Sequence, residues 1–310
     1  MADAVLLLSI VVATLRAATP LLFGGLGELV SERSGVLNLG VEGMMLMGAA
    51  TGFAAHAATG SFVLGLLAGI LAGALMAALF ALLTLRLLAN QVATGLALTI
   101  FGIGLSALIG LPWAGTPDQG LPATLWPGLA HASPALQQVL LLLDPLVWLA
   151  FASVIAVDWF LHRSRAGLAL RAVGESAEVA HALGTSVLRI RLAAVLFGGA
   201  MAGLAGADLS LAYTPMWMEN MTAGRGWIAL ALVVFSTWKP WRLTAGALLF
   251  GFVTIAQFQA EAFGLSFSPD LLATLPYLAT IVVLVLISRD ATRLRLAAPA
   301  ALGKPFRPTD

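Results

Sequence analysis

Cysteine is absent from the 310 residues of this chain, which excludes disulfides, thiolate metal sites and cysteine nucleophiles. Charged residues are scarce and make up 10% of the chain, against roughly a quarter in a typical soluble protein. The net charge is only +1, and no basic stripe exists outside short loops, so a nucleic acid partner is not expected. The scarcity of charged residues argues against a soluble globular protein.

Motifs of catalysis and cofactor binding are missing as well. The sequence has no GxxxxGKS/T phosphate-binding loop, no HExxH metal motif and no GxSxG nucleophile motif. Its four histidines (His56, His131, His162 and His181) are scattered along the chain, which weakens any interpretation as a metal site. We therefore expect no catalytic residue, no metal site and no cofactor bound by this chain.

Apolar sequence is what the chain has in abundance: 60% of its residues are hydrophobic and the mean hydropathy is +0.97. These residues lie in long runs, and about 20 of them cross the hydrocarbon of a bilayer as one helix. We predict an all-α, polytopic membrane protein with about nine transmembrane helices, within a range of eight to ten. The predicted segments are residues 4–27, 36–58, 61–85, 91–112, 141–161, 190–213, 226–238, 243–263 and 271–288.

Lysine and arginine predict the orientation, because short cytoplasmic loops carry an excess of them. With nine alternating spans, 14 of the 16 basic residues fall on the side of the carboxyl terminus. We therefore expect the amino terminus outside the cell and the carboxyl terminus in the cytoplasm. Residues 1–288 then form a single transmembrane domain, and residues 289–310 a basic cytoplasmic tail.

Two loops stand out by their length. The external loop 113–140 is expected to form a partly re-entrant cap, with a ligand-contacting lid as the alternative. The cytoplasmic loop 162–191 predicts a short helix that Gly174 or Ser176 caps and Gly184 ends. An amphipathic helix facing the cytosol is typical of a docking element for another protein. The alternative is an interfacial helix that lies on the lipid surface.

Polar side chains inside the predicted spans are costly in hydrocarbon, roughly 2.5–3.5 kcal/mol for a charge. Asn38 and Glu42 are four residues apart, so in a helix they share a face, which lines a cavity or bonds a neighbouring helix. Arg16 is expected to pair with a carboxylate or to contact a solute, and with Pro20 it predicts a break in the first span. Asp208 is interpreted as ending its span near the outer surface.

Small residues recur at every fourth position in the third predicted span. Gly65, Gly69 and Gly73 lie on one helical face and permit close approach of a second backbone. We expect this stripe to pack against helices of the same chain, and a dedicated dimer seam is the alternative.

Three blocks of sequence carry a family resemblance. They are GELVSERSGVLNLGVEGMMLMGA (27–49), RAVGESAEVAHALG (171–184) and GRGWIALALVVFSTWKPW (224–241). In this order and spacing they resemble permease subunits of bacterial ABC importers, in the branched-chain amino acid, ribose and simple-sugar permease family. Within that family the chain looks most like the nucleoside or simple-sugar type, and the resemblance runs from about residue 5 to 288.

The resemblance implies roles for particular residues. Segment 171–184 is similar to the segment that couples such permeases to their ATP-binding subunit, and the other two blocks are similar to segments beside the translocation pathway. The coupling residues implied are Arg171, Gly174, Glu175, Ala182 and Gly184. The pathway residues implied are Asn38, Glu42, Gly224, Gly226 and Trp227, the last three near the external side.

Partners and transport mechanism follow from the same resemblance. It implies a cytosolic ATP-binding subunit that uses the ATP, a second and non-identical permease, and a periplasmic or lipid-anchored substrate-binding protein. The chain would be a transport subunit of the bacterial cytoplasmic (inner) membrane, not an enzyme, and would import nucleosides by alternating access. Simple sugars or branched-chain amino acids are alternative solutes. An ion-coupled secondary transporter, with Glu42 as the protonatable group, is the alternative mechanism.

Overall fold

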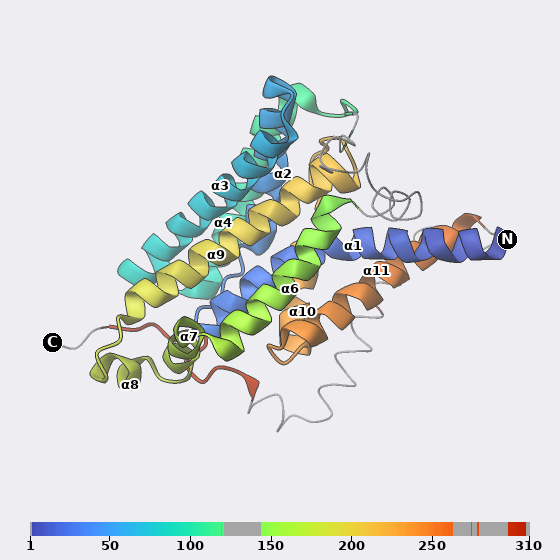
Figure 1. Cartoon of the computed structure of the whole chain (residues 1–310). Coiled ribbons are helices and arrows are strands. Elements are labelled where there is room, and N and C mark those ends of the chain that lie inside the picture. The colour runs from blue at the N-terminus through green and yellow to red at the C-terminus, as the bar shows by residue number, and fades with distance from the viewer. Residues whose placement is uncertain are drawn as a thin grey trace.

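The computed structural model describes residues 2–118, 120, 144–262, 274, 278 and 297–307 (Figure 1). Within these ranges all regular elements are helical, which confirms the predicted all-α class. The α-helices are α1 (Ala2–Arg33), α2 (Val41–Thr59), α3 (Phe62–Ala81), α4 (Gln91–Gly110), α6 (Pro145–Arg163), α7 (Arg165–Glu175), α8 (Ala177–Ala182), α9 (Val187–Asp208), α10 (Arg225–Phe235) and α11 (Pro240–Ala262). Short helices prolong three of them: η1 (Leu82–Arg86) after α3, η2 (Leu111–Trp113) after α4, and η5 (Leu209–Tyr213) after α9.

Five helical stretches of the described residues are long and apolar enough to cross a membrane. They are Leu7–Arg33, Phe62–Arg86, Gln91–Trp113, Pro145–Arg163 and Val187–Tyr213. The predicted segments at 36–58, 226–238 and 243–263 are also helical, as α2, α10 and α11. The predicted segment 271–288 and most of the external loop 113–140 lie outside the described residues, so the total of nine helices stays a prediction.

Helix α9 lies at the centre of the bundle and packs against α1, α2 and α3. Close approach depends on small residues from both sides of the interface. A Cβ atom at Gly69 would lie 2.7 Å from the Cβ of Ala207 in α9, and one at Gly73 would overlap the carbonyl oxygen of Gly199. A Cβ at Gly65 would lie 2.9 Å from the carbonyl oxygen of Gly52 in α2. The glycine stripe of α3 therefore faces helices of the same chain.

The predicted break in the first span is wrong, because α1 continues without interruption from Ala2 to Arg33. Pro20 removes one helical hydrogen bond, and membrane helices tolerate such a loss when neighbouring helices pack around it. Arg16 has partners outside its own helix: its Nε lies 3.2 Å from Asp144 Oδ2, and its Nη2 donates to the carbonyl oxygen of Ala212. The predicted pairing of Arg16 with a carboxylate is confirmed.

The two ends of the bundle differ in what they carry (Figure 1). At one end lie α7, α8 and the C-terminal segment 297–307, and we call it the α8 end. At the opposite end α4 and η5 finish and α6 begins. Helix α10 spans only part of the distance between them, because its 11 residues at about 1.5 Å each are roughly 16 Å long, half of a bilayer core.

Candidate translocation and coupling sites

Glu42 is a buried carboxylate, 3% exposed, in the first turn of α2. It accepts hydrogen bonds from the hydroxyl of Thr222, from the backbone N–H of Gly224 at 2.9 Å and from that of Gly226 at 2.6 Å. These N–H groups belong to the start of α10, where a helix leaves donors unpaired and carries partial positive charge. The Glu42 side chain therefore caps the half-length helix α10.

The geometry of this contact requires glycine at two positions. Gly224, the residue before α10, has φ +81°, which is left-handed backbone that side chains disfavour. A Cβ at Gly226 would lie 2.6 Å from the Cα of Glu42, so no other residue fits there without displacement. The structure thus brings together Glu42, Gly224 and Gly226, three of the residues implied for the pathway. Trp227 follows them with 39% of its surface exposed.

Asn38 does not share a helical face with Glu42, and this expectation is wrong. Helix α2 begins only at Val41, so Asn38 lies in the buried turn before it. The side-chain oxygen of Asn38 accepts from the N–H of Gly40 at 2.9 Å, and its backbone N–H donates to Glu28 Oε1. Asparagine favours such local bonds over continuing a helix. Asn38 shapes the turn between α1 and α2.

The segment that follows the end of α10 is fixed as well, and here the contacts come from α1. The indole N–H of Trp238 donates to Glu32 Oε2, and Arg33 Nη2 donates to the carbonyl oxygen of Trp238 at 3.1 Å. Glu32 is 1% exposed, so its carboxyl group is buried against this partner. Sequence reasoning missed this role, because nothing in the chain connects position 32 with position 238.

At the α8 end, the predicted short helix is present as α8. Ser176 caps it by accepting from the N–H of Val179, and Gly184 follows its last turn with φ +82°. Gly174 is not a cap: it lies inside α7, where a Cβ would overlap the carbonyl oxygen of Arg33. Sequence alone could not choose between Ser176 and Gly174, because both suit the start of a helix.

The remaining coupling candidates surround the same contact with α1. Arg171 and Glu175, both in α7, lie within electrostatic reach of Arg33 at the end of α1. Ala182 is the last residue of α8, and on the outside of this helix Val179 is 59% and Leu183 80% exposed. Segment 171–184 therefore touches the bundle through α7 and presents α8 outward.

The C-terminal segment 297–307 ties these elements together. The N–H of Ala301 donates to the carbonyl oxygen of Gly174 at 2.9 Å, and the N–H of Gly303 donates to that of Gly35 at 3.1 Å. Arg191, 1% exposed at the start of α9, donates to the carbonyl oxygens of Ser34 and Lys304.

Farther along the same segment, Phe306 is 5% exposed and closes a small apolar cluster on the α7–α8 face. The other members of this cluster are Val173, Ala177, Ala180 and Val187. The sequence reading, which saw only a basic tail at 289–310, missed these contacts.

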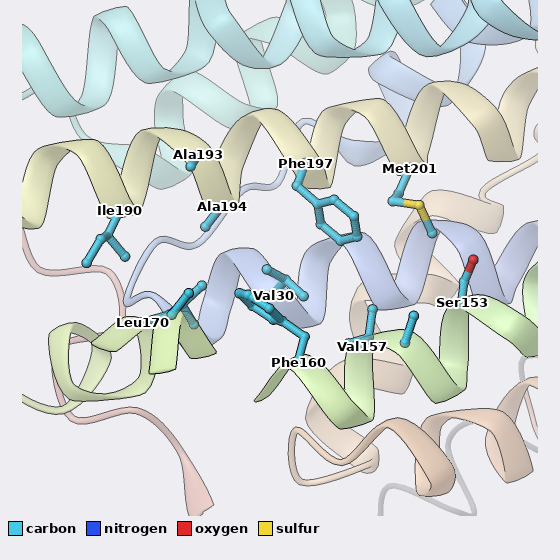
Figure 2. A pocket seen from close by; sticks show the side chains of 12 residues that line it. Val30, Ser153, Val157, Phe160, Leu170, Ile190, Ala193, Ala194, Phe197 and Met201 are labelled. Atoms are coloured by element: carbon cyan, nitrogen blue, oxygen red, sulfur yellow. The ribbon is translucent and has the colours of Figure 1, made fainter. Parts of the chain in front are cut away.

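A cavity of about 390 Å³ lies between α1, α6, α7 and α9 (Figure 2). Figure 2 shows Phe160, Phe197 and Met201 directed into it, and Ser153 is the one hydroxyl in its lining. Such a lining offers almost no hydrogen bonds to a polar solute, so this cavity does not suit a translocation pathway. Within the described ranges, no group of three His, Asp or Glu side chains is placed to hold a metal ion.

Comparisons with known proteins match most of this chain. The family model of the branched-chain amino acid transport system permease component matches residues 10–287. A putative glucose ABC transporter permease of Haloferax volcanii is 42% identical, over 95% of this chain and 96% of that protein. A nucleoside ABC transporter permease of Lactococcus lactis is 32% identical over 90% and 92% of the two chains. For a guanosine ABC transporter permease of Bacillus subtilis the identity is 30% over 81% and 82%.

No solved structure matches the chain. The relatives are permease subunits of ABC transporters, which move solutes and are not enzymes, and the helices described above are those of a multi-pass membrane protein. The chain belongs to the branched-chain amino acid transport system permease family and is a permease subunit of an ABC transporter.

Proposed function

We propose that this chain is one of two non-identical permeases of an importer that carries a neutral, ring-hydroxylated solute into the cytoplasm. The family match over residues 10–287 carries the proposal. Relatives named for glucose and for nucleosides support solutes with several ring hydroxyls over branched-chain amino acids. The sequence reading favoured nucleosides, but the relative of 42% identity is named for glucose, so both solutes enter the test.

A second permease is part of the proposal. Besides the first relative, a second glucose ABC transporter permease of Haloferax volcanii is 26% identical over 88% of this chain. Two such proteins from one organism support a transporter built from two different permeases. A cytosolic ATP-binding subunit uses the ATP, and a substrate-binding protein delivers the solute from outside.

The α8 end is proposed to face the cytoplasm, with the amino terminus outside. Basic residues gather at this end: Arg33 ends α1, Arg86 and Arg189 line the same shallow cavity, and Arg163 ends α6. The positive-inside rule assigns this end to the cytosol. Membrane domain 1–288, the basic tail 289–310 and location in the cytoplasmic membrane follow as proposals.

Coupling is assigned to segment 171–184, with Arg171, Gly174, Glu175, Ala182 and Gly184 as its key residues. The exposed side chains of Val179 and Leu183 would dock on the ATP-binding subunit, because exposed apolar patches outside the lipid mark protein interfaces. Movement of α7 then reaches α1 directly through the contact of Gly174 with Arg33. A rigid-body shift of this kind switches a bundle between outward and inward openings.

In the pathway, Glu42, Gly224 and Gly226 are proposed to act by fixing the start of α10 about halfway through the bundle. Asn38 holds the turn that brings α2 to this position. Discontinuous helices with ends near the midplane are a recurring feature of solute sites in transporters. Trp227 is exposed on the first turn of α10, and we propose that it contacts the solute or the second permease.

The test is reconstitution of this chain with its second permease, the ATP-binding subunit and the binding protein in proteoliposomes. Uptake of radiolabelled glucose or guanosine should require ATP and all four proteins. Glu175→Arg should insert normally and hydrolyse ATP, but uptake per ATP should fall severalfold. Glu219→Arg makes the same charge change at an exposed position of the opposite end and serves as control. Accumulation by the permeases alone under a proton gradient would instead establish a secondary transporter.

A further inference from the structure

A cluster of charged side chains lies toward the opposite end of the bundle, where α1, α6, η5 and α10 meet. Arg16 comes from α1, Asp144 precedes α6, Asp208 ends α9, Tyr213 ends η5 and Arg225 begins α10. Four of the five residues are arginine or aspartate; three of these lie inside predicted spans, and Arg225 lies directly beside one. Such residues are costly in a membrane, so a use for them is expected.

Contacts within the cluster join its members into one network. Arg16 pairs with Asp144 at 3.2 Å, and the guanidinium of Arg225 lies 5.5 Å from the ring centre of Tyr213. Asp208 lies within electrostatic reach of Asp144, Arg16 and Arg225. The cluster contains two arginines and two aspartates, so their formal charges cancel.

Asp208 is the member whose bonding capacity is not used. Its side chain is 2% exposed, and Oδ2 has no hydrogen-bond partner among the described residues. A buried carboxylate oxygen without a donor is destabilising, and such atoms are rare in folded proteins. The side chain of Arg16 remains 38% exposed, whereas Asp208 is buried within the cluster.

The backbone around Asp208 and Arg225 is irregular on both sides. The α-helical pattern of α9 stops at Asp208 and gives way to the π-helical turn η5. Before α10, Asn220 has φ +56° and Ala223 has φ +47°, although neither is glycine. π-turns and left-handed non-glycine residues are energetically unfavourable and concentrate at functional sites.

We propose that this cluster is a solute-binding site, in which Asp208 accepts hydrogen bonds from ring hydroxyls and Arg16 and Arg225 donate to ring oxygens. Tyr213 supplies an aromatic surface beside them. This combination of a hydrogen-bond acceptor, two guanidinium donors and an aromatic ring suits a neutral polyhydroxylated ring such as a sugar or the ribose of a nucleoside. The proposal rests on the proposed import function, since Asp208 is shielded in this conformation and alternating access must uncover it.

The test uses Asp208→Asn in the reconstituted four-protein transporter. Uptake is measured for glucose and guanosine and for their monodeoxy analogues, together with ATP hydrolysis stimulated by the loaded binding protein. The KM of the parent solute should rise about tenfold or more, because a hydrogen bond to a charged group is lost. At least one monodeoxy analogue should be carried equally well by variant and wild type, since it lacks the hydroxyl that Asp208 binds.

Asp158→Asn is the matched control, since Asp158 lies in α6 near its opposite end and bonds His162 there. It should leave every KM unchanged. If Asp208→Asn does not accumulate in the membrane, Arg225→Lys is assayed in the same way, because lysine keeps the charge but loses the two-pronged donor.

Two outcomes overturn the inference. Equal effects on the parent solute and on all deoxy analogues would mean that the cluster only packs helices, and an unchanged KM would mean that Asp208 does not contact the solute. Both outcomes leave the proposed function intact, because ATP-dependent uptake by the wild-type assembly tests that function separately.

Discussion

At the scale of single residues, Glu42 shows most clearly how a buried carboxylate can be recognised in a sequence while its partners cannot. A carboxylate inside a predicted span indicated either a cavity lining or a hydrogen bond to a neighbouring helix, and the structure shows the second. Its two oxygens in fact accept from one hydroxyl and two backbone N–H groups at the start of α10. The helix end supplies the donors and the positive partial charge that a buried carboxylate needs.

Glu42→Gln is expected to lower the stability of the protein by about 1–3 kcal/mol, because a charged hydrogen-bond acceptor becomes neutral and its amide group faces donors. The transition temperature in detergent should fall, and uptake should fall with it as α10 loses its position. Glu219→Gln, at an exposed position between η5 and α10, is the control and should change neither. Unchanged melting of Glu42→Gln would show that the cap contributes nothing to α10.

Gly226→Ala tests the same contact from the other side. A Cβ here would lie 2.6 Å from Cα and from the carboxylate of Glu42, so α2 and α10 would have to separate. We expect loss of most folded protein from the membrane, measured by monodispersity after detergent extraction. Gly104→Ala in α4 is the control, since a Cβ there meets nothing within 4 Å and alanine favours helix. Equal behaviour of the two variants would contradict the close contact.

How much of the site the sequence could reveal differs from residue to residue. Glu42, Gly224 and Gly226 were singled out, because buried charge and glycine are visible in a sequence. Their partnership was not, since it joins positions some 180 residues apart. Asp208 was interpreted as a residue that ends its span, but the helical stretch continues from it through η5 to Tyr213, and the unpaired oxygen of Asp208 became visible only in three dimensions.

At the scale of elements, capping residues in the sequence predicted the ends of α8 correctly, whereas features that depend on contacts between distant residues were not predicted. The start of α8 at Ser176 and its end before Gly184 follow from capping, which depends on a few neighbouring residues. The extent of α1 was misjudged, because Pro20 and Arg16 disfavour a helix locally and are tolerated only through neighbouring helices. The docking of segment 297–307 on α7 could not be predicted, since it depends on contacts more than 100 residues apart.

The C-terminal segment gives a prediction at this scale. Phe306→Ala should loosen the α7–α8 face, because the ring is 5% exposed and removal of a buried phenylalanine costs about 3 kcal/mol or more in a well-packed core. Uptake per ATP hydrolysed should fall, while the bundle stays folded. Arg307→Ala, at the exposed neighbouring position, is the control. A ratio equal to that of wild type would mean that the segment has no part in coupling.

At the scale of the whole molecule, hydropathy predicted the bundle of helices but not its internal asymmetry. Helix α10 is too short to cross a bilayer, and both its ends are fixed by buried carboxylates, Glu42 at the start and Glu32 beyond the end. The α8 end is tied by α7 and by segment 297–307 to the ends of α1 and α9. These contacts connect α8 to α1 and α9, the two helices that also contribute Arg16 and Asp208, and the proposed movement of α8 would reach these helices first.

Orientation in the membrane is the remaining property of the whole molecule, and the absence of cysteine makes it simple to measure. Leu183→Cys places a single thiol at the exposed tip of the α8 end, and Glu219→Cys places one at the opposite end. A membrane-impermeant maleimide added to intact cells should label Glu219→Cys at once and Leu183→Cys only after permeabilisation. The wild type has no thiol and reports the background. The reverse pattern would put the α8 end outside, where no ATP-binding subunit could reach it, and would contradict the proposed importer.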